Sequence, residues 1–275
     1  MFTTQLLSAG QSTAAEQAAT FTRANPLSGE VVTTAAAASV GDANTAADAA
    51  GRAFEAWSKT GPGERRAKLL KAAELMEARQ GDFIDRMVEE TGATLGWAGF
   101  NVKVAADVLR EAAALTTKIQ GDIIPSNVPD SMAMGVRVPC GVVVGIAPWN
   151  APIILGTRAI ATPLACGNSV ILKASEQCPA THHLIGEVLQ DAGFGDGVVN
   201  VITNAPDNAA DVVSALIAHP AVRRINFTGS TGVGKIIAEQ AAKQLKPVRI
   251  SMPPWTQRFL ARSLTKARSA CPPSE

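Results

Sequence analysis

One run of β-branched residues strongly limits what this chain can fold into. Residues 141–146 read Gly-Val-Val-Val-Gly-Ile, and Ala147, Pro148, Trp149 and Asn150 follow directly. A short apolar run that stops at a proline and an amide side chain predicts a buried parallel strand. In open α/β sheets, ligands bind beyond the carboxyl ends of the strands at a topological switch point. Trp149 and Asn150 therefore stand where a ligand is expected.

The segments that follow repeat this order of strand and helix. Strands alternating with helices of ordinary length are typical of a doubly wound parallel sheet with right-handed crossovers. The predicted fold class is therefore α/β. After an extended segment at 131–138, the pattern predicts strands at 169–173, 198–203 and 223–227 and helices at 152–165, 180–192, 209–218 and 231–243.

The first half of the chain is predicted to form a hairpin and a layer of helices. Residues 20–23 and 31–34 flank a turn that contains Pro26 and Gly29, which suits two paired strands. Helical spacing and capping signals then predict helices beginning near residues 42, 62, 82 and 95. Residues 1–19 show neither caps nor periodicity, so a loosely held leader is expected there.

Composition argues against several classes of partner. The chain has 275 residues, a formal net charge of +1 and no basic tract, so it shows no electrostatic footprint for nucleic acid or an anionic membrane. Neither a signal peptide nor a long apolar run is present, and a reducing cytoplasm is the expected location. The cysteines have no close metal-type spacing; they are Cys140, Cys166, Cys178 and Cys271.

Three motifs resemble signatures of the NAD(P)-dependent aldehyde dehydrogenase superfamily, in that family's order and spacing. They are Ile-Ala-Pro-Trp-Asn at 146–150, Lys-Ala-Ser-Glu at 173–176 and Phe-Thr-Gly-Ser-Thr-Gly-Val-Gly at 227–234. The match runs from about residue 25 to residue 247. Trp-Ala-Gly-Phe-Asn-Val at 97–102 further resembles the salicylaldehyde and vanillin dehydrogenase branch. The resemblance implies an oxidoreductase that converts an aromatic aldehyde into its carboxylate with NAD or NADP.

Asn150 has two interpretations. Its position alone favours a cap on the helix that begins at Pro152. Its amide nitrogen could instead donate to a developing oxyanion, which matters most in a dry, preorganised site. The resemblance implies the second role, because the family's asparagine at this place stabilises the thiohemiacetal oxyanion. Asn150 is therefore the predicted catalytic residue.

The predicted cofactor contacts lie at the ends of neighbouring strands. Lys173 and Glu176 could hydrogen-bond the hydroxyls of a ribose, although such a pair is otherwise more typical of a solvated surface. Gly229 and Ser230 open a helix whose free amides suit a phosphate, but the glycine spacing is not the usual dinucleotide fingerprint. The resemblance implies ribose contacts from Lys173 and Glu176, a pyrophosphate contact from Ser230, and a dinucleotide site lined by Ile146, Pro148 and Trp149.

Two features carry no predicted role. Residues 204–206, Asn-Ala-Pro, replace a glycine-containing turn that is usual in the family, which leaves cofactor contacts there open. His182 and His183 are adjacent on a predicted helix and point to different faces, and His219 precedes a proline. No spacing of cysteines or carboxylates completes a metal set with them. Surface or satisfied core positions are expected for all three histidines.

The end of the chain departs from the family. After Pro247 the family pattern requires a Glu-Leu-Gly-Gly-Lys turn, whereas residues 249–255 read Arg-Ile-Ser-Met-Pro-Pro-Trp. Aldehyde oxidation in this family also needs a cysteine thiolate in a Gly-Gln-x-Cys setting and a glutamate that activates water. No cysteine of this chain has that setting, and buried structural thiols are expected for Cys140, Cys166 and Cys178. The resemblance thus implies a chain without the catalytic domain and the oligomerisation portion, so family-type homo-oligomers are not expected.

Residues 249–275 have the character of a shifted reading frame. Codons built from the last base of one codon and the first two of the next can encode Asp-Leu-Asp-Ala-Ala-Val-Asp-Ala-Ala-Val-Phe-Gly-Ala-Phe-Ala-His-Gln-Gly-Gln-Ile-Cys-Met-Ser-Thr-Glu-Arg. This string resembles the family's catalytic-cysteine segment. Only one base of each shifted codon is free, so a match of this length is not expected by chance. Trp255 and Phe259 should then pack poorly.

Four segments are therefore expected in the chain. They are a loose leader at 1–19, a hairpin and helical layer at 20–130, an NAD(P)-binding α/β domain at 131–248 and a frameshifted tail at 249–275. The first hypothesis is an aromatic aldehyde dehydrogenase that is catalytically incomplete. The alternatives are a dinucleotide-binding fragment without redox activity and an unstable remnant.

Overall fold

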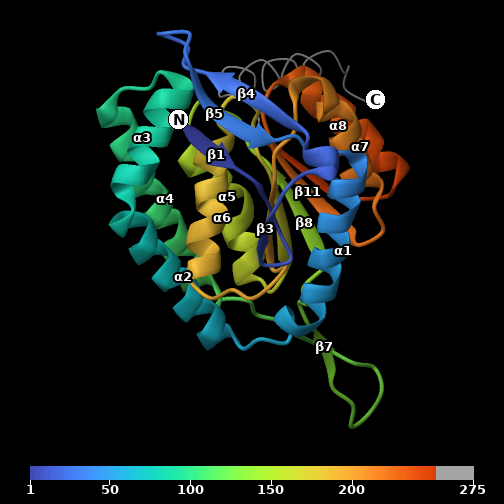
Figure 1. Ribbon diagram of the computed structural model, residues 1–275. Coiled ribbons are helices and arrows are strands. Elements are labelled where there is room, and N and C mark those ends of the chain that lie inside the picture. The colour runs from blue at the N-terminus through green and yellow to red at the C-terminus, as the bar shows by residue number, and fades with distance from the viewer. Residues whose placement is uncertain (252–275) are drawn as a thin grey trace, which may run out of the picture.

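A seven-stranded sheet lies at the centre of the computed structural model, which describes residues 1–251 (Figure 1). Its strand order is β12-β11-β8-β9-β10-β2-β3. The parallel strands are β8 (Val142–Ile146), β9 (Ser169–Lys173), β10 (Val199–Ile202), β11 (Val222–Thr228) and β12 (Val248–Ser251). The chain passes from β8 through β9 to β10 and then crosses to β11 on the other side of β8. The predicted doubly wound sheet is confirmed, and its switch point lies between β8 and β11.

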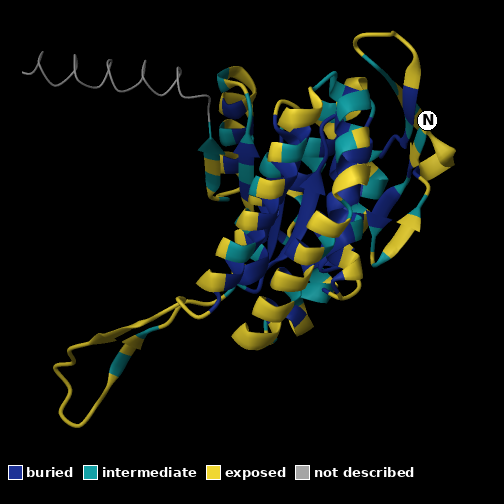
Figure 2. Ribbon diagram, turned by 90° about the vertical axis from the view of Figure 1, so that its left-hand side faces the viewer, coloured by how far each residue is buried: buried dark blue, intermediate teal, exposed yellow. Residues whose placement is uncertain are grey.

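Helices cover both faces of this sheet. Helices α2 (Pro62–Ala78), α4 (Leu95–Leu115), α5 (Pro152–Ala165) and α6 (Pro179–Asp191) contribute to one core, and α1 (Val40–Trp57), α7 (Ala209–Ala218) and α8 (Thr231–Lys243) to the other. Helix α3 (Gln80–Thr91) adds Phe83 and Met87 to the first core. Val143 and Val144 of β8 point into opposite cores, as expected for successive residues of a strand. Burial on both faces explains why β8 reads as an unbroken apolar run (Figure 2).

The N-terminal residues differ from the expected loose leader. Strand β2 (Leu6–Ser8) pairs antiparallel with β10, and β3 (Gln11–Thr13) extends the sheet beyond it. Leu6 and Leu7 are 3% and 2% exposed and enter opposite cores. The expectation of a loose leader is therefore wrong. Strands β2 and β3 are three residues long, too short for a recognisable period, and the pairing of β2 with the distant β10 holds them in the central sheet.

The predicted N-terminal hairpin is confirmed. Strand β4 (Thr20–Ala24) pairs antiparallel with β5 (Val31–Ala36), and β1 (Phe2–Thr4) joins β5 in parallel to complete a separate small sheet. Asn25 closes the turn, since its side-chain oxygen accepts from the amide of Leu27 at 2.8 Å.

A second hairpin projects from the body of the molecule (Figures 1 and 2). It consists of β6 (Asp122–Ile124) and β7 (Ala133–Gly135), the latter within the segment predicted to be extended. Its apolar side chains are solvent-exposed and join neither core; they include Ile123, Ile124, Val128, Met132, Met134 and Val136.

The predicted boundary before the tail is placed too early. Residues 249–251 continue β12, and β12 pairs in parallel with β11 from Val248 to Ser251. Cys271 and the predicted poor packing of Trp255 and Phe259 lie outside the described residues. Within residues 1–251, no helix is both long enough and apolar enough to cross a membrane.

A carboxylate on α6 ties this helix to α2 and α3. Glu187 accepts from Arg79 Nη2 at 2.8 Å and from His183 Nδ1 at 2.9 Å, and Arg86 Nη1 lies 3.7 Å from it. The hydrogen bond from His183 lowers the pKa of Glu187 to about 2, although partial burial opposes the shift and the arginines add to it. The ionised carboxylate is therefore the form that favours the folded state.

Acid should remove the contribution of Glu187 to the unfolding free energy. A carboxyl group whose pKa is lowered by folding stabilises the protein above its ordinary value of 4.5, and this contribution is lost as the pH falls towards about 2. Glu187→Gln should make the unfolding free energy fall less steeply with acid, by about 1 kcal/mol after allowing for solvent screening. Urea unfolding between neutral and acidic pH measures this. Asp191→Asn, which removes an exposed carboxylate on the same Arg79, is the control. Parallel pH curves for Glu187→Gln and the unaltered chain would contradict the assignment.

Candidate active site and cofactor site

The register of the sheet brings the predicted site residues to one edge. Ile146 of β8 pairs with Lys173 of β9 and with Phe227 of β11. Lys173 pairs in turn with Ile202 of β10. Because the strands are parallel, the loops after β8, β9, β10 and β11 emerge side by side at their carboxyl ends. These loops carry Pro148, Trp149 and Asn150, then Glu176, then Asn204, and finally Gly229 and Ser230.

Three polar side chains meet beyond β9 and β10. Lys173 is 5% exposed, and its ammonium group binds Oε1 of Glu176. Asn204 Nδ2 donates to the same oxygen at 3.2 Å and to the carbonyl of Ala205 at 2.8 Å. Burial raises the pKa of Glu176, but the charge and hydrogen bond of Lys173, helped by Asn204, outweigh it and lower the pKa overall. The predicted pair is therefore a largely buried cluster with an ionised carboxylate.

Asn204 is the member that sequence reasoning missed. It stands two residues beyond the end of β10, and its place at a strand's carboxyl end was the available signal. Its side-chain oxygen is buried and accepts no hydrogen bond from the described residues. The two acceptors bound by Nδ2 fix the orientation of the amide, so this oxygen is an acceptor that needs a donor. A ribose hydroxyl would supply such a donor, so this acceptor fits the predicted nucleotide.

The loop after β11 fits a phosphate, with Gly232 rather than Gly229 as the open backbone position. Ser230 caps α8, because its Oγ accepts from the amide of Val233 at 3.4 Å, and its hydroxyl hydrogen remains available for a phosphate oxygen. A Cβ on Gly229 would come within 2.5 Å of the Phe227 ring, whereas a Cβ on Gly232 would meet nothing within 4 Å. Gly229 is thus required for packing, and the backbone at Gly232 is open to a ligand at the positive end of α8.

Asn150 does not cap α5. The N-cap residue is Ala151, and no side chain caps this helix. The backbone oxygen of Asn150 accepts instead from Nε1 of Trp97 at 3.1 Å. The interpretation of Asn150 as a cap is therefore wrong, and its amide group stays available for a ligand.

Three aromatic rings are exposed around this segment. Trp97 stacks on Phe100, with ring centroids 5.5 Å apart and planes inclined by 18°. Trp97, Phe100 and Trp149 are 43%, 52% and 52% exposed. Exposed rings of this size are costly in water unless a flat or apolar group covers them. They lie on the motif and on the strand end that sequence reasoning singled out.

The described cysteines do not complete this site. Cys140 is exposed and precedes β8, so it lies at the end of the strand opposite Asn150. It connects the projecting hairpin to the sheet, and its predicted burial is wrong for this reason. Cys166 is partly buried, and burial raises the pKa of its thiol. Cys178 is fully buried, as predicted, and burial raises its pKa well above the ordinary value.

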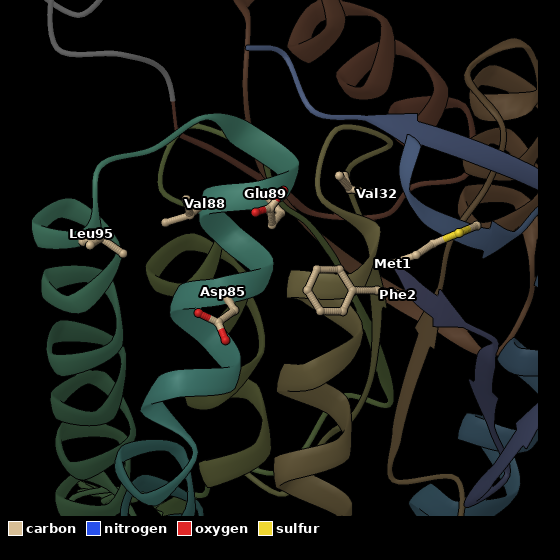
Figure 3. A pocket seen from close by; sticks show the side chains of 7 residues that line it. All are labelled: Met1, Phe2, Val32, Asp85, Val88, Glu89 and Leu95. Carbon is tan, nitrogen blue, oxygen red and sulfur yellow. The ribbon is translucent and has the colours of Figure 1, made fainter. Parts of the chain in front are cut away.

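A pocket of about 440 Å³ lies elsewhere, between β1, β5 and α3 (Figure 3). None of the predicted site residues lines it; its walls are Met1, Phe2, Val32, Asp85, Val88, Glu89 and Leu95. Its charged side chains are the carboxylates of Asp85 and Glu89, which would repel the phosphates of a dinucleotide. The carboxyl edge of the sheet therefore remains the candidate site.

Comparison with known proteins now decides the family. The model of the aldehyde dehydrogenase family matches residues 13–253. The chain belongs to the aldehyde dehydrogenase family. Members of this family are oxidoreductases that use NAD or NADP. The sequence-based assignment is therefore confirmed.

Similar proteins include vanillin and salicylaldehyde dehydrogenases that are about twice as long. The chain is 60% identical over 252 residues to a vanillin dehydrogenase of Pseudomonas fluorescens, covering 92% of this chain and 52% of that protein. It is 50% identical over 227 residues to a salicylaldehyde dehydrogenase of Pseudomonas putida, covering 82% and 47%. The crystal structure of a salicylaldehyde dehydrogenase from Pseudomonas putida G7 with salicylaldehyde gives a TM-score of 0.90 at 46% identity, over 92% of this chain and 52% of that one. The chain spans about half the length of these relatives.

Removal of the buried ammonium group should weaken dinucleotide binding. Lys173→Ala takes away a hydrogen-bond donor and leaves Glu176 without its counter-charge, so NAD(P) should bind about tenfold more weakly. Isothermal titration calorimetry measures the dissociation constant. Lys71→Ala, on the exposed face of α2, is the matched control and should bind as the unaltered chain does. An unchanged affinity in Lys173→Ala would remove Lys173 from the cofactor site.

Proposed function

We propose that this chain is the dinucleotide-binding part of an aromatic aldehyde dehydrogenase and binds NAD or NADP at the carboxyl edge of its sheet. One observation carries the proposal: Lys173, Glu176 and Asn204 converge beyond neighbouring strands, and the side-chain oxygen of Asn204 accepts no hydrogen bond from residues 1–251. A buried acceptor and a buried ion pair, at the same carboxyl edge of the sheet as the loop of Ser230, have the chemistry of a ribose and phosphate site. The other proposed cofactor contacts lie at the same edge of the sheet; they are Ile146, Pro148, Trp149 and Gly229.

Asn150 is the chain's own contribution to catalysis. Negative charge would develop on the carbonyl oxygen when a nucleophile adds to the aldehyde carbon, and the side-chain amide of Asn150 would donate to that oxygen. NAD or NADP, when bound, would supply the hydride acceptor for the tetrahedral carbon that results. The backbone of Asn150 is held by Trp97, so the donor starts from a fixed segment. This is the role that a preorganised oxyanion donor requires.

The aromatic surface supports an aromatic substrate. Trp97 and Phe100 offer a stacked pair beside Asn150, and Trp149 is exposed on the same segment. Flat rings pack favourably against such a pair. The similar vanillin and salicylaldehyde dehydrogenases are named for substrates of this class. An aromatic aldehyde is therefore the proposed small-molecule partner.

Oxidation itself needs a thiolate that the described residues do not place beside Asn150. Cys178 is buried with a raised pKa, and Cys140 lies at the opposite end of β8. The second candidate function, dinucleotide binding without redox activity, follows from this observation. The free thiols of the described residues agree with the cytoplasm as the proposed location.

The purified chain should not oxidise aldehydes. An oxyanion donor without a nucleophile cannot form the thioester, so NAD(P)H should not accumulate with salicylaldehyde, vanillin or benzaldehyde. Absorbance of the reduced cofactor measures this, and Asn150→Ala should leave the absence of turnover unchanged. Turnover that a thiol-blocking reagent abolishes would show that a cysteine of this chain is the nucleophile after all.

The frameshift proposal makes a separate prediction about the gene. The shifted codons of residues 249–275 resemble the family's catalytic-cysteine segment, so the missing cysteine codon would straddle Ser269 and Ala270. Nucleotide sequencing across these codons should show the shifted frame, which should stay open beyond residue 275 into a family-like segment. Early stop codons in that frame would refute the proposal.

A further inference from the structure

His182 connects the two halves of the candidate site through hydrogen bonds at both ring nitrogens. The backbone amide of Ser175, in the turn that carries Glu176, donates to Nδ1 at 3.0 Å. On the other side of the ring, Nε2 lies 3.1 Å from the carbonyl oxygen of Pro152. Pro152 is the first residue of α5 and stands two positions after Asn150.

The two partners determine the tautomer of the ring. A backbone amide can only donate, so Nδ1 must be the unprotonated acceptor, and a carbonyl can only accept, so Nε2 must carry the hydrogen. The ring is fully buried, and burial lowers the pKa of His182 to about 4. A neutral ring with both nitrogens engaged has no free site for proton exchange with a substrate. His182 is therefore unsuited to acid–base catalysis.

Helices α5 and α6 approach each other closely at the His182 ring. A Cβ on Gly156 of α5 would come within 3.0 Å of Cδ2 and 3.3 Å of Nε2 of His182. Glycine at this position lets the ring reach the carbonyl of Pro152. The Oγ of Ser175 also accepts from the amide of Gln177 at 3.3 Å, which tightens the turn around Glu176. The ring thus sits between two segments that are shaped around it.

We propose that His182 is a positioning residue that holds the turn of Glu176 against the segment of Asn150. It thereby fixes the distance and orientation between the proposed ribose contact of Glu176 and the proposed oxyanion donor Asn150. Among the described residues, it is the one side chain that hydrogen-bonds both segments. The inference rests on the proposed function, which assigns a cofactor contact to Glu176 and an oxyanion contact to Asn150. If His182 only filled space in the core, loss of its two hydrogen bonds would not change the position of the Asn150 segment or the affinity for the cofactor.

Four proteins separate these roles: the unaltered chain, His182→Leu, His182→Gln and His183→Leu. Leucine removes both bonds, whereas the glutamine amide carries one acceptor and one donor on a planar end and can replace them. His183→Leu makes the same change at the neighbouring buried histidine, whose ring contacts Glu187 instead. It is therefore a control for loss of stability without loss of the bridge.

The first measurement needs no cofactor. Nitrogen–proton correlation NMR of the unaltered chain should show His182 as the Nε2–H tautomer, without titration between about pH 5 and about pH 8. The indole N–H resonances of Trp97 and Trp149 report on the Asn150 segment, since Nε1 of Trp97 donates to the Asn150 carbonyl. They should shift in His182→Leu and stay near their original positions in His182→Gln and His183→Leu.

The second measurement is the NAD(P) dissociation constant of the four proteins. His182→Leu should bind about tenfold more weakly, because each buried partner left without its hydrogen bond favours movement of the turn. His182→Gln and His183→Leu should bind like the unaltered chain. If the unaltered chain fails to bind, the proposed function fails, and the NMR result still decides the role of His182.

Three results would overturn the proposal. One is an Nδ1–H tautomer or a titrating His182 in the unaltered chain, which also decides the case if His182→Leu does not fold. Another is a His182→Leu protein with unshifted indole resonances and unchanged cofactor affinity. The third is a His183→Leu protein whose indole resonances and affinity change as much as those of His182→Leu, which would reduce the effect to general stability.

Discussion

The parallel pairing of β8 with β9 and β11 is the constraint on which the site depends. The register sets Ile146 level with Lys173 and Phe227, so three loops start from one line across the sheet. That register is held by close packing beneath it: a Cβ on Gly145 would come within 2.9 Å of the Cβ of Ala159 on α5. A shift of β8 would therefore separate Asn150 from the ribose cluster and push α5 off the sheet at the same time.

The turn between β9 and α6 is held from two sides. His182 binds its amide at Ser175, and Glu90 of α3 binds the beginning of the helix. Glu90 is fully buried and accepts from the amides of Ala180 and Thr181 at 2.8 and 2.9 Å, and from the hydroxyls of Thr181 and Thr33 at 2.7 and 2.9 Å. Burial raises the pKa of Glu90, and these hydrogen bonds oppose the shift. A carboxylate at the start of a helix also interacts favourably with the helix dipole. The helical layer thus supports the edge of the sheet that carries the proposed cofactor site, although it contributes no predicted cofactor contact.

Sequence reasoning found the parts of the fold that local pattern determines. The bounds predicted for α5, α7 and α8 agree with the structure, because a proline or a capping serine marks the start of α5 and of α8 and helical spacing fills the rest. It missed β2 and β3, since three residues carry no period and β2 joins the sheet by pairing with a strand almost two hundred positions away, with Leu7 opposite Val201. It also missed Asn204. The replacement of the family's glycine-containing turn by residues 204–206 showed that a usual feature was absent, but it did not show which groups the side chain of Asn204 contacts. The bonds of His182 depend on the distance between two helices, which no local pattern contains.

The location of the site within the chain separates cofactor binding from chemistry. Every group proposed to hold the dinucleotide comes from the segment that begins at Ile146 and ends at the first turn of α8, and this segment belongs to one continuous sheet. Strand β12 completes the pairing of β11 before the described residues end. The nucleophile that oxidation requires is a separate element, and the described cysteines lie away from Asn150 or beneath the surface. A change in the chain after β12 would therefore affect the proposed reaction while leaving the proposed cofactor site intact.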